Sequence, residues 1–245
     1  MKIRNTVSGM MALAVATMMF VSSCSKDDSG SISDTDLALA QDEAYADALY
    51  DEVDNITGSE IATLDENNYT PEDLKSTADW ICATITVDHP DLVTFPKHIT
   101  IDYGEGCSVV LNGDTITRTG KILVTLSDRW YVEGATQSVT FENFTFNGVQ
   151  VEGTRTLTNL GLNAKNHFEL GVVLQNGKLT FNDTAWMTRE CNQVREWALH
   201  LNPLNDSIIV TGTASGTNIL GEDYDRVITD PIVFGRCTQY NYQWG

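Results

Sequence analysis

The sequence predicts a mainly β protein, an antiparallel meander that closes as a sandwich or as a barrel, preceded by a short acidic helix near the N-terminus. Three observations carry this prediction. After Trp80, apolar residues recur at every second position, which is the period of a half-buried strand. Asn-Gly pairs separate several of these runs, and Asn-Gly is the strongest short-range signal of a β-hairpin. Before residue 80 the apolar period is that of a helix.

The acidic helix is predicted from Asp34 to Ile56, with Ser33 or Asp34 as its cap. Its apolar stripe is thin, so we expect the helix to dock against the following domain or to be marginal alone. We expect its acidic residues to cover the remaining surface. Residues 57–79 are predicted to be a linker with at most a short turn of helix. The stripe consists of Tyr45, Leu49, Val53 and Ile56, and the acids are Asp42, Glu43, Asp47, Asp51, Glu52 and Asp54.

The domain over residues 80–245 is predicted to contain about ten or more strands. Its first hairpin joins Ala83–Asp88 to His98–Tyr103. A slip in the apolar phase predicts a β-bulge at Glu142-Asn143. A transmembrane barrel fits poorly, because its lipid-facing strands would be more apolar. The turn signals are Asn112-Gly113-Asp114, Asn147-Gly148 and Asn176-Gly177, of which the last two are flanked by alternating runs and predict hairpins.

Four cysteines other than Cys24 are consistent with an oxidising compartment, because an even number permits two disulfides among three connectivities. Cys82 and Cys107 stand at the outer ends of the first hairpin and are placed to bridge its base. Cys191 then pairs with Cys237 by elimination; the alternative is four unpaired thiols. We expect no metal and no cofactor, since Cys-x-x-Cys is absent and the four histidines are scattered.

The N-terminus predicts a lipoprotein signal peptide over residues 1–23. Lys2 and Arg4 supply positive charge, and residues 7–21 form an apolar run that is too short for a permanent membrane span. The run ends in Val21-Ser22-Ser23-Cys24, which resembles the lipobox cut by the lipoprotein signal peptidase. Cys24 is therefore the predicted lipidation site, and acyl chains on it anchor the protein to a membrane. The alternative is a general secretory signal.

Residues 24–33 are predicted to be a flexible tether, because they are rich in Ser, Asp and Gly. The tether begins with Ser25-Lys26-Asp27-Asp28, which is similar to the acidic signal that sends Bacteroidota lipoproteins to the outer face of the outer membrane. Charged residues are also ordinary in any tether. We therefore expect an outer-membrane lipoprotein exposed at the cell surface, with a periplasm-facing location as the alternative.

The chain is strongly acidic, with 34 Asp and Glu residues against 15 Lys and Arg residues and a net charge of −19. Nucleic-acid binding needs a basic footprint, so the charge excludes nucleic acid as a partner. Adsorption to anionic lipid through side-chain charge is excluded for the same reason. Residues 25–79 hold 16 of the acids against Lys26 and Lys75, which marks a boundary before the β domain.

Five segments of the β domain, such as His98–Cys107 and Val151–Asn159, carry a resemblance. They are similar to segments of a widespread group of uncharacterised Bacteroidota lipoproteins with an all-β exported domain. The likeness covers residues 80–245 and implies no chemistry, because the group has no established activity. Relatives tend to continue with further strands, so this chain, which stops at Trp244-Gly245, is either truncated or ends in an edge strand. The segments lie at residues 98–107, 118–124, 141–144, 151–159 and 212–218.

The candidates for chemistry each have a plainer interpretation, and we predict no catalytic residue. Ser215, within Gly212–Gly216, has the wrong spacing for a nucleophile elbow. His89-Pro90-Asp91 lies in the first hairpin loop, where Pro and Asp are turn residues. Residues 222–225 offer oxygen ligands for calcium but follow Gly221, which favours a solvated turn.

Two further features are typical of exported binding proteins. Aromatic residues on the β segments form a platform for sugar rings if several face outward together, although aromatics in strands are more often core. Asp–hydroxyl–aliphatic triplets resemble the O-glycosylation acceptor of exported Bacteroidota proteins. The aromatics are Trp130-Tyr131, Trp186, Trp197, Tyr240, Tyr242 and Trp244, and the acceptors are Thr115, Thr184 and Ser207.

These observations leave two hypotheses of function. The first is a non-enzymatic surface lipoprotein, whose β domain is an adhesive, envelope-structural, or glycan- or protein-binding module displayed on the acidic helix as a stalk. The second is a hydrolase of extracellular glycans, which requires two carboxyl groups roughly 5–9.5 Å apart in a concave pocket. An open cavity in the domain would instead indicate a periplasmic ligand carrier.

Overall fold

The computed structural model describes residues 34–66, 82–89, 91, 93–111, 114–200 and 206–235. The predicted signal peptide, Cys24, the tether, Cys237 and the aromatic residues after position 239 lie outside the described residues. The described chain contains one helix, α2 (Asp34–Glu66), and ten strands. The strands are β1 (Thr84–Val87), β2 (Lys97–Asp102), β3 (Cys107–Leu111), β4 (Asp114–Leu126), β5 (Thr136–Phe146), β6 (Val149–Leu162), β7 (Phe168–Asn182), β8 (Ala185–Ala198), β9 (Ser207–Thr217) and β10 (Asp223–Gly235).

The ten strands form one antiparallel sheet in meander order. The path runs β1-β2-β4-β5-β6-β7-β8-β9-β10, and β3 pairs with β4 beside it. The predicted mainly β, antiparallel fold with an N-terminal acidic helix is therefore confirmed. The sheet is not closed into a barrel: the described edge strands β1 and β10 each pair with one neighbour only.

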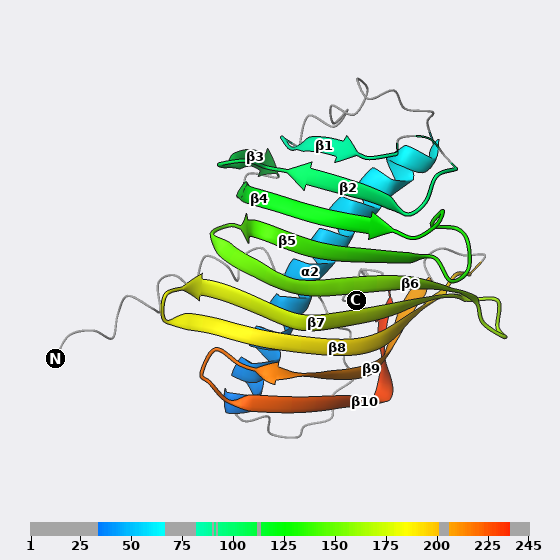
Figure 1. Cartoon of the computed structure of the whole chain (residues 1–245). Helices are drawn as coiled ribbons and strands as arrows, with labels where there is room; N and C mark the ends of the chain where they lie inside the picture. Colours follow the sequence, from blue (N-terminus) through cyan, green and yellow to red (C-terminus); the bar gives the residue numbers. More distant parts are fainter. Residues whose placement is uncertain are drawn as a thin grey trace, which may run out of the picture.

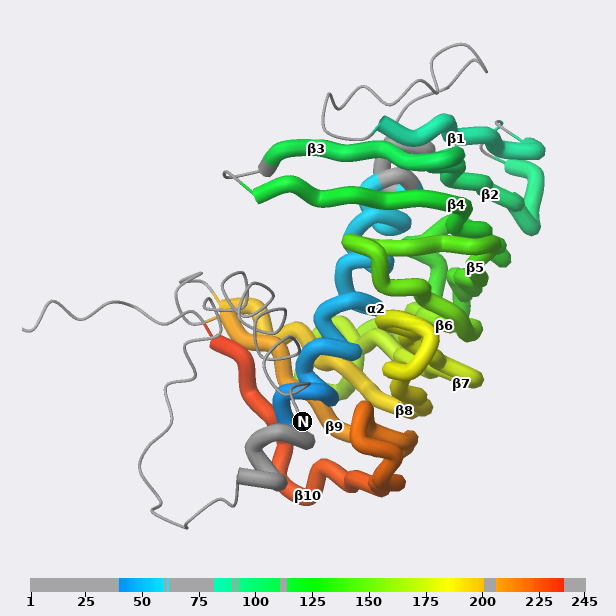
Figure 2. The backbone as a smooth tube through the Cα atoms, turned by 90° about the vertical axis from the view of Figure 1, so that its left-hand side faces the viewer, coloured from blue at the N-terminus to red at the C-terminus, as the bar shows by residue number. Residues whose placement is uncertain are grey.

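The second layer of the domain is α2, which crosses one face of the sheet diagonally (Figure 1). Seen from the side, the sheet curves around α2, with the hairpins at its two edges reaching past the helix (Figure 2). We call the side that carries α2 the concave face. Its buried core combines the apolar stripe of α2 with inward residues of the strands, among them Ile101, Ile122, Phe144 and Leu174.

The helix docks against the sheet, which confirms the first of the two expectations for its thin apolar stripe. It is therefore not a separate stalk. Ala46, Tyr50 and Val53 are almost fully buried. The helix is also longer than predicted and ends at Glu66 rather than Ile56. The Thr57 hydroxyl donates back to the carbonyl oxygen of Val53, and Ile61 continues the buried stripe. Packing against the sheet thus extends a helix that local propensity ends earlier.

The two Asn-Gly predictions have opposite outcomes. Asn147-Gly148 is the turn between β5 and β6, and both residues have positive φ, as a two-residue hairpin turn requires. The hairpin predicted at Asn176-Gly177 is wrong, because β7 runs through it and the β7–β8 turn comes after Asn182. Asn176-Gly177 instead forms a bulge, with register shifts against both neighbouring strands.

The bulge at Asn176-Gly177 has a steric cause. Gly177 lies so close to β8 that an added Cβ would overlap the backbone carbonyl oxygen of Arg189. On the other side, a Cβ on Gly153 would come within 2.8 Å of the Gly177 Cα. The bulge predicted at Glu142-Asn143 is present, with Asn143 at φ 50° and a register shift opposite it in β4.

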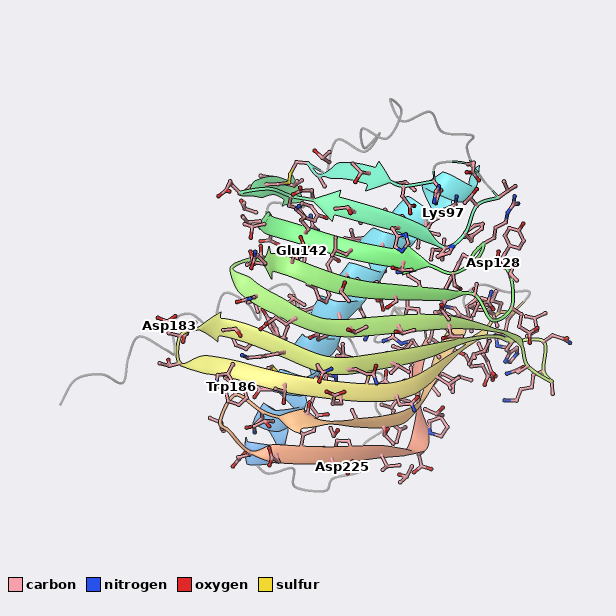
Figure 3. All side chains as sticks on the ribbon, in the orientation of Figure 1. Lys97, Asp128, Glu142, Asp183, Trp186 and Asp225 are labelled. Atoms are coloured by element: carbon pink, nitrogen blue, oxygen red, sulfur yellow. A yellow bond between two sulfur atoms is a disulfide. The ribbon has the colours of Figure 1, made fainter. Side chains whose placement is uncertain are left out.

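The sheet has two unlike ends. Short turns join β5 to β6 and β7 to β8 at one end, which we call the turn end, where Asp183 and Trp186 lie (Figure 3). The longer connections β1–β2, β4–β5, β6–β7 and β8–β9 gather at the opposite end, the loop end, near Lys97 and Asp128 (Figure 3). Among the described residues, no helix combines the length and apolar composition that a membrane crossing requires.

Candidate functional site: the helix–sheet seam

The acidic residues of α2 face the sheet, where arginines from four strands meet them. The strand arginines occupy inward positions of the alternating pattern, so the fold directs them at the helix. We call these contacts the helix–sheet seam. It joins Arg118 to Glu52, Arg155 to Asp51 and Asp54, Arg189 to Asp47 and Glu43, Arg195 to Asp51, and Arg226 to Glu43.

Arg155 of β6 is the centre of the seam. Its side chain is 1% exposed. Its Nε donates to both carboxylate oxygens of Asp54 at 3.0 Å, and its Nη2 donates to Asp54 Oδ2 at 2.6 Å and to Asp51 Oδ1 at 2.8 Å. The Tyr50 ring lies 5.8 Å from the guanidinium carbon. Such a forked, charge-assisted arrangement satisfies a buried guanidinium.

Other seam contacts extend along the helix on both sides of Arg155. Toward the start of α2, Arg189 Nη2 of β8 donates to Asp47 Oδ2 at 2.7 Å. Beside the centre, Arg195 Nη2 shares Asp51 Oδ1 with Arg155, also at 2.7 Å. On the far flank, Arg118 Nη2 of β4 donates to Glu52 Oε1 at 2.7 Å. Ion pairs therefore border the apolar stripe along its length.

Uncharged hydrogen bonds also join α2 to the sheet. The Tyr50 hydroxyl donates to the backbone carbonyl oxygen of Glu152 in β6 at 2.7 Å. The Gln137 side chain of β5 donates to the Thr57 hydroxyl at 2.5 Å. Both contacts lie inside the interface, where an unmatched polar group costs about 1–3 kcal/mol. They fix how far the helix can slide or rotate.

Burial and ion pairing act in opposite directions on the pKa values of the seam. Burial raises the pKa of Asp54 and of Asp47, and the contacts with Arg155 and Arg189 offset only part of that effect. Burial also disfavours the charged form of Arg155, but the carboxylates of Asp54 and Asp51 outweigh it and raise its pKa. Ion pairing therefore more than compensates the burial of Arg155 but only partly compensates the burial of Asp47 and Asp54.

Chemically, the seam is a set of carboxylates whose oxygens already accept guanidinium hydrogen bonds. The hydrolase hypothesis requires two carboxyl groups that converge in a pocket. Asp51 and Asp54 do converge, but on the guanidinium of Arg155. Both lie on α2 and point at the sheet, because their shared partner belongs to β6. A carboxylate held in this way is a poor nucleophile, because its oxygens already accept hydrogen bonds from the guanidinium.

Histidines meet carboxylates at the loop end. His98 Nδ1 lies 2.7 Å from Asp88 Oδ2, and both side chains are exposed. His167 Nδ1 lies 2.6 Å from Glu196 Oε1. The hydrogen bond from His167 lowers the pKa of Glu196. Within the described ranges, no group of three His, Cys, Asp or Glu side chains is placed to hold a metal ion.

The structure contains the predicted disulfide between Cys82 and Cys107, and the predicted Cys191–Cys237 pair includes a residue outside the described ranges. Cys82 and Cys107 are bonded, with Cα atoms 5.8 Å apart, and tie the start of β3 to the segment before β1. Cys191 is a buried free thiol, and its predicted partner, Cys237, lies outside the described residues.

The structure separates the other candidate residues. The O-glycosylation candidates Thr115 and Thr184 are exposed, whereas Ser207 is half-buried between Ala198 and Gly235. Trp186 is exposed at the turn end, and Trp197 is half-buried on the concave face at the loop end. Trp186 and Trp197 therefore do not share one platform. At the calcium candidate, Glu222 accepts a hydrogen bond from Asn218, and Tyr224 is buried against Arg189.

The seam is the feature that the sequence interpretation missed, because the helix acids were assigned to the solvent-facing surface. A signal for it was present in the spacing. Glu43, Asp47, Asp51 and Asp54 recur at four, four and three residues and so share one side of the helix. Charged residues at the inward phase of a strand, such as Arg155 and Arg189, predict buried partners of opposite charge.

Comparison with protein-family models, with curated proteins and with solved structures finds no match to this chain.

Proposed function

We propose that this protein is an exported outer-membrane lipoprotein, anchored through lipid on Cys24 and displayed at the cell surface, whose β domain is a non-enzymatic binding, adhesive or envelope-structural module. The observation that carries the proposal is the helix–sheet seam. The concave face, where a curved sheet would hold a substrate, contains the protein's own helix, packed through its apolar stripe and paired through Arg155.

The face of the sheet opposite α2, its convex face, is rich in hydroxyl groups. Thr125, Ser138 and Thr156 lie side by side on β4, β5 and β6. Thr119 and Thr145 hydrogen-bond to each other across β4 and β5 at 2.8 Å. A broad, regular, polar face suits contact with another surface rather than enclosure of a small substrate.

The anchor is tested by mass spectrometry of the protein purified from its native host membranes. We expect an N-terminal peptide that begins at acylated Cys24, and Cys24→Ser should release the chain from the membrane fraction. Protease treatment of intact cells tests display, because a surface domain is cut and a periplasm-facing one is protected. An unmodified Cys24 in a membrane-associated protein contradicts the proposed anchor.

The module is tested with the chain from residue 25 onward, which keeps the whole described helix and sheet, on arrays of glycans and envelope proteins. We expect saturable binding to one ligand class without turnover. Release of product from any arrayed glycan would contradict a non-enzymatic role and favour the hydrolase hypothesis.

A further inference from the structure

Two Asn-Gly pairs of the described chain lie in unlike surroundings. Asn147-Gly148 is the turn between β5 and β6, at the turn end of the sheet (Figure 1). Asn176-Gly177 is the bulge inside β7. In such a pair the backbone nitrogen of glycine can attack the side-chain amide carbon of asparagine, because glycine has no Cβ that shields its nitrogen. The surroundings of each pair then decide whether the attack takes place.

The side-chain amide of Asn147 is held in one orientation. Its Oδ1 accepts a hydrogen bond from the backbone N–H of Thr117 in β4 at 2.8 Å. The Asn147 N–H donates to the Thr117 carbonyl oxygen, also at 2.8 Å. Attack on the amide carbon puts negative charge on Oδ1, and the Thr117 N–H already points at that atom. A fixed donor at the developing oxyanion stabilises the transition state.

The Asn147-Gly148 turn also has room and water for the reaction. Both residues are exposed, and a Cβ added to Gly148 would have no atom within 4 Å. Water is needed to accept the proton of the attacking nitrogen and later to open the ring. The turn therefore combines an oriented amide with an accessible nucleophile.

The second pair is shielded. Gly177 is buried, and a Cβ added to it would lie 2.3 Å from the carbonyl oxygen of Arg189. On the other side, a Cβ added to Gly153 would lie 3.0 Å from the Gly177 nitrogen. The Asn176 N–H donates to Glu190 Oε1 at 2.6 Å, and a carboxylate so close opposes further negative charge. Gly177 therefore lacks both the space to move and access to water.

We propose that Asn147 is a site of spontaneous deamidation in the folded protein, through a cyclic imide formed with Gly148, and that the fold protects Asn176. The Gly148 nitrogen bonds to Asn147 Cγ, and the bond from Cγ to the side-chain nitrogen breaks. The proton lost from Gly148 ends on the departing nitrogen, which leaves as ammonia. Water then opens the ring at either carbonyl carbon and restores the N–H of Gly148, which gives aspartate or isoaspartate without any oxidant or other reactant.

The two products differ in their effect on the turn. Aspartate keeps an oxygen that can accept the hydrogen bond from Thr117. Isoaspartate brings the Cβ of residue 147 into the main chain, so the connection is longer than the two-residue turn that matches β5 to β6. Either product adds one negative charge to the turn end. The inference goes beyond the proposed function and does not depend on it, because the reaction needs no ligand.

The experiment incubates the chain from residue 25 onward at neutral pH for several weeks, with the same chain unfolded in guanidinium chloride as the reference. Peptide mapping at mildly acidic pH, which suppresses the reaction during digestion, measures aspartate and isoaspartate at each position. In the folded chain we expect Asn147 to convert at least about tenfold faster than Asn176. In the unfolded chain we expect similar rates at the two sites.

Gly148→Ala tests the attacking nitrogen, because the added methyl group crowds it. We expect conversion of Asn147 in the folded chain to slow about tenfold. Gly221→Ala is the matched control: Gly221 has φ 81° against 80° for Gly148, and an added Cβ would likewise have no atom within 4 Å. It lies in the β9–β10 turn, so Asn147 should convert at the original rate. Circular dichroism verifies that both variants are folded.

Four outcomes overturn the inference. In the folded chain, Asn176 converts as fast as Asn147, or Asn147 stays intact while the unfolded chain converts. The unfolded chain shows the same difference between the two sites, which would assign their reactivity to local sequence. Gly148→Ala and Gly221→Ala slow the conversion of Asn147 equally. None of these results bears on the membrane anchor or on the array experiment, so the proposed function is tested separately.

Discussion

Arg155 of β6 and Asp54 of α2, 101 residues apart in the chain, are joined by three hydrogen bonds at 2.6 to 3.0 Å. The Arg155 side chain is almost fully enclosed, and that of Asp54 is only slightly exposed. A pair of this kind is costly to break from one side, because the remaining charge stays buried without a partner. The pair also fixes the axial position of α2 on the sheet.

We predict that Arg155→Met lowers the free energy of unfolding by about 3–5 kcal/mol, because it leaves the Asp54 carboxylate in a buried site without its partner. Chemical denaturation monitored by circular dichroism measures the loss. Arg226→Met is the matched control: Arg226 pairs with Glu43 of the same helix at 3.3 Å but is about half exposed. Its loss should be below about 1 kcal/mol. Equal effects at the two positions would contradict a central role for Arg155.

The bulge in β7 predicts opposite effects for two glycine-to-alanine changes. Gly177→Ala should destabilise the domain by about 2 kcal/mol, because the new Cβ overlaps the Arg189 backbone across the strand pair. Gly58→Ala should stabilise it by up to about 1 kcal/mol, because Gly58 lies in α2 with no atom within 4 Å of an added Cβ. Thermal unfolding of both variants checks the prediction, which fails if the two melting temperatures move in the same direction.

The cysteines within the described ranges predict one disulfide, between Cys82 and Cys107. Non-reducing peptide mapping should recover Cys82 linked to Cys107, with Cys191 alkylated only after unfolding, since it is a buried thiol. Replacing Cys82 and Cys107 by serine should destabilise the domain by about 3 kcal/mol, the value expected for a loop of this length. Recovery of a disulfide-linked Cys191 peptide would contradict the free thiol at this position.

Asp91 in the β1–β2 connection gives a pH-dependent prediction. Its carboxylate accepts backbone hydrogen bonds from Val93 at 2.8 Å and Thr94 at 2.6 Å, and these lower its pKa from 3.8 to about 2. The Asp91 carboxylate therefore binds a proton more readily in the unfolded chain than in the folded protein. The contribution of Asp91 is therefore complete above about pH 3.8 and is lost as pH falls toward about 2.

Asp91→Asn keeps an acceptor oxygen and removes the titration. We expect the difference in unfolding free energy between the original protein and Asp91→Asn to shrink as pH falls through this window. The raised pKa values of Asp47 and Asp54 act in the opposite direction, since protonation in the folded state favours folding on acidification. The two variants share those groups, so their contribution cancels in the difference. A difference that does not change with pH contradicts the prediction.

Exposure distinguishes the three O-glycosylation candidates. Thr115 and Thr184 are exposed, and Ser207 is half-buried between two strands, so we expect modification of the first two in protein from the native host. Mass spectrometry of the mature protein locates the sites, and Asp114→Ala should remove the glycan from Thr115 alone. Unmodified peptides covering Thr115 and Thr184 would contradict the motif assignment.

Much of the fold followed from local patterns. The sequence alone predicts the alternating strands, the Asn147-Gly148 turn and the bulge at Glu142-Asn143. Each depends only on neighbouring residues, or on a backbone conformation that few side chains tolerate. Asn176-Gly177 carries the same local signal as Asn147-Gly148 but forms a bulge. The close approach of Gly153 and Gly177 decided that outcome, and this contact joins different strands.

The strand period, the acidic helix, the strongly acidic net charge and the pairing of Cys82 with Cys107 can be predicted from the sequence alone. The position of the helix on the sheet is visible only in the tertiary structure. So is the pairing of its acids with arginines of β4, β6, β8 and β10. The physical reason is that burial and ion pairing depend on which strands become neighbours, and strand order is set by the packing of the whole chain.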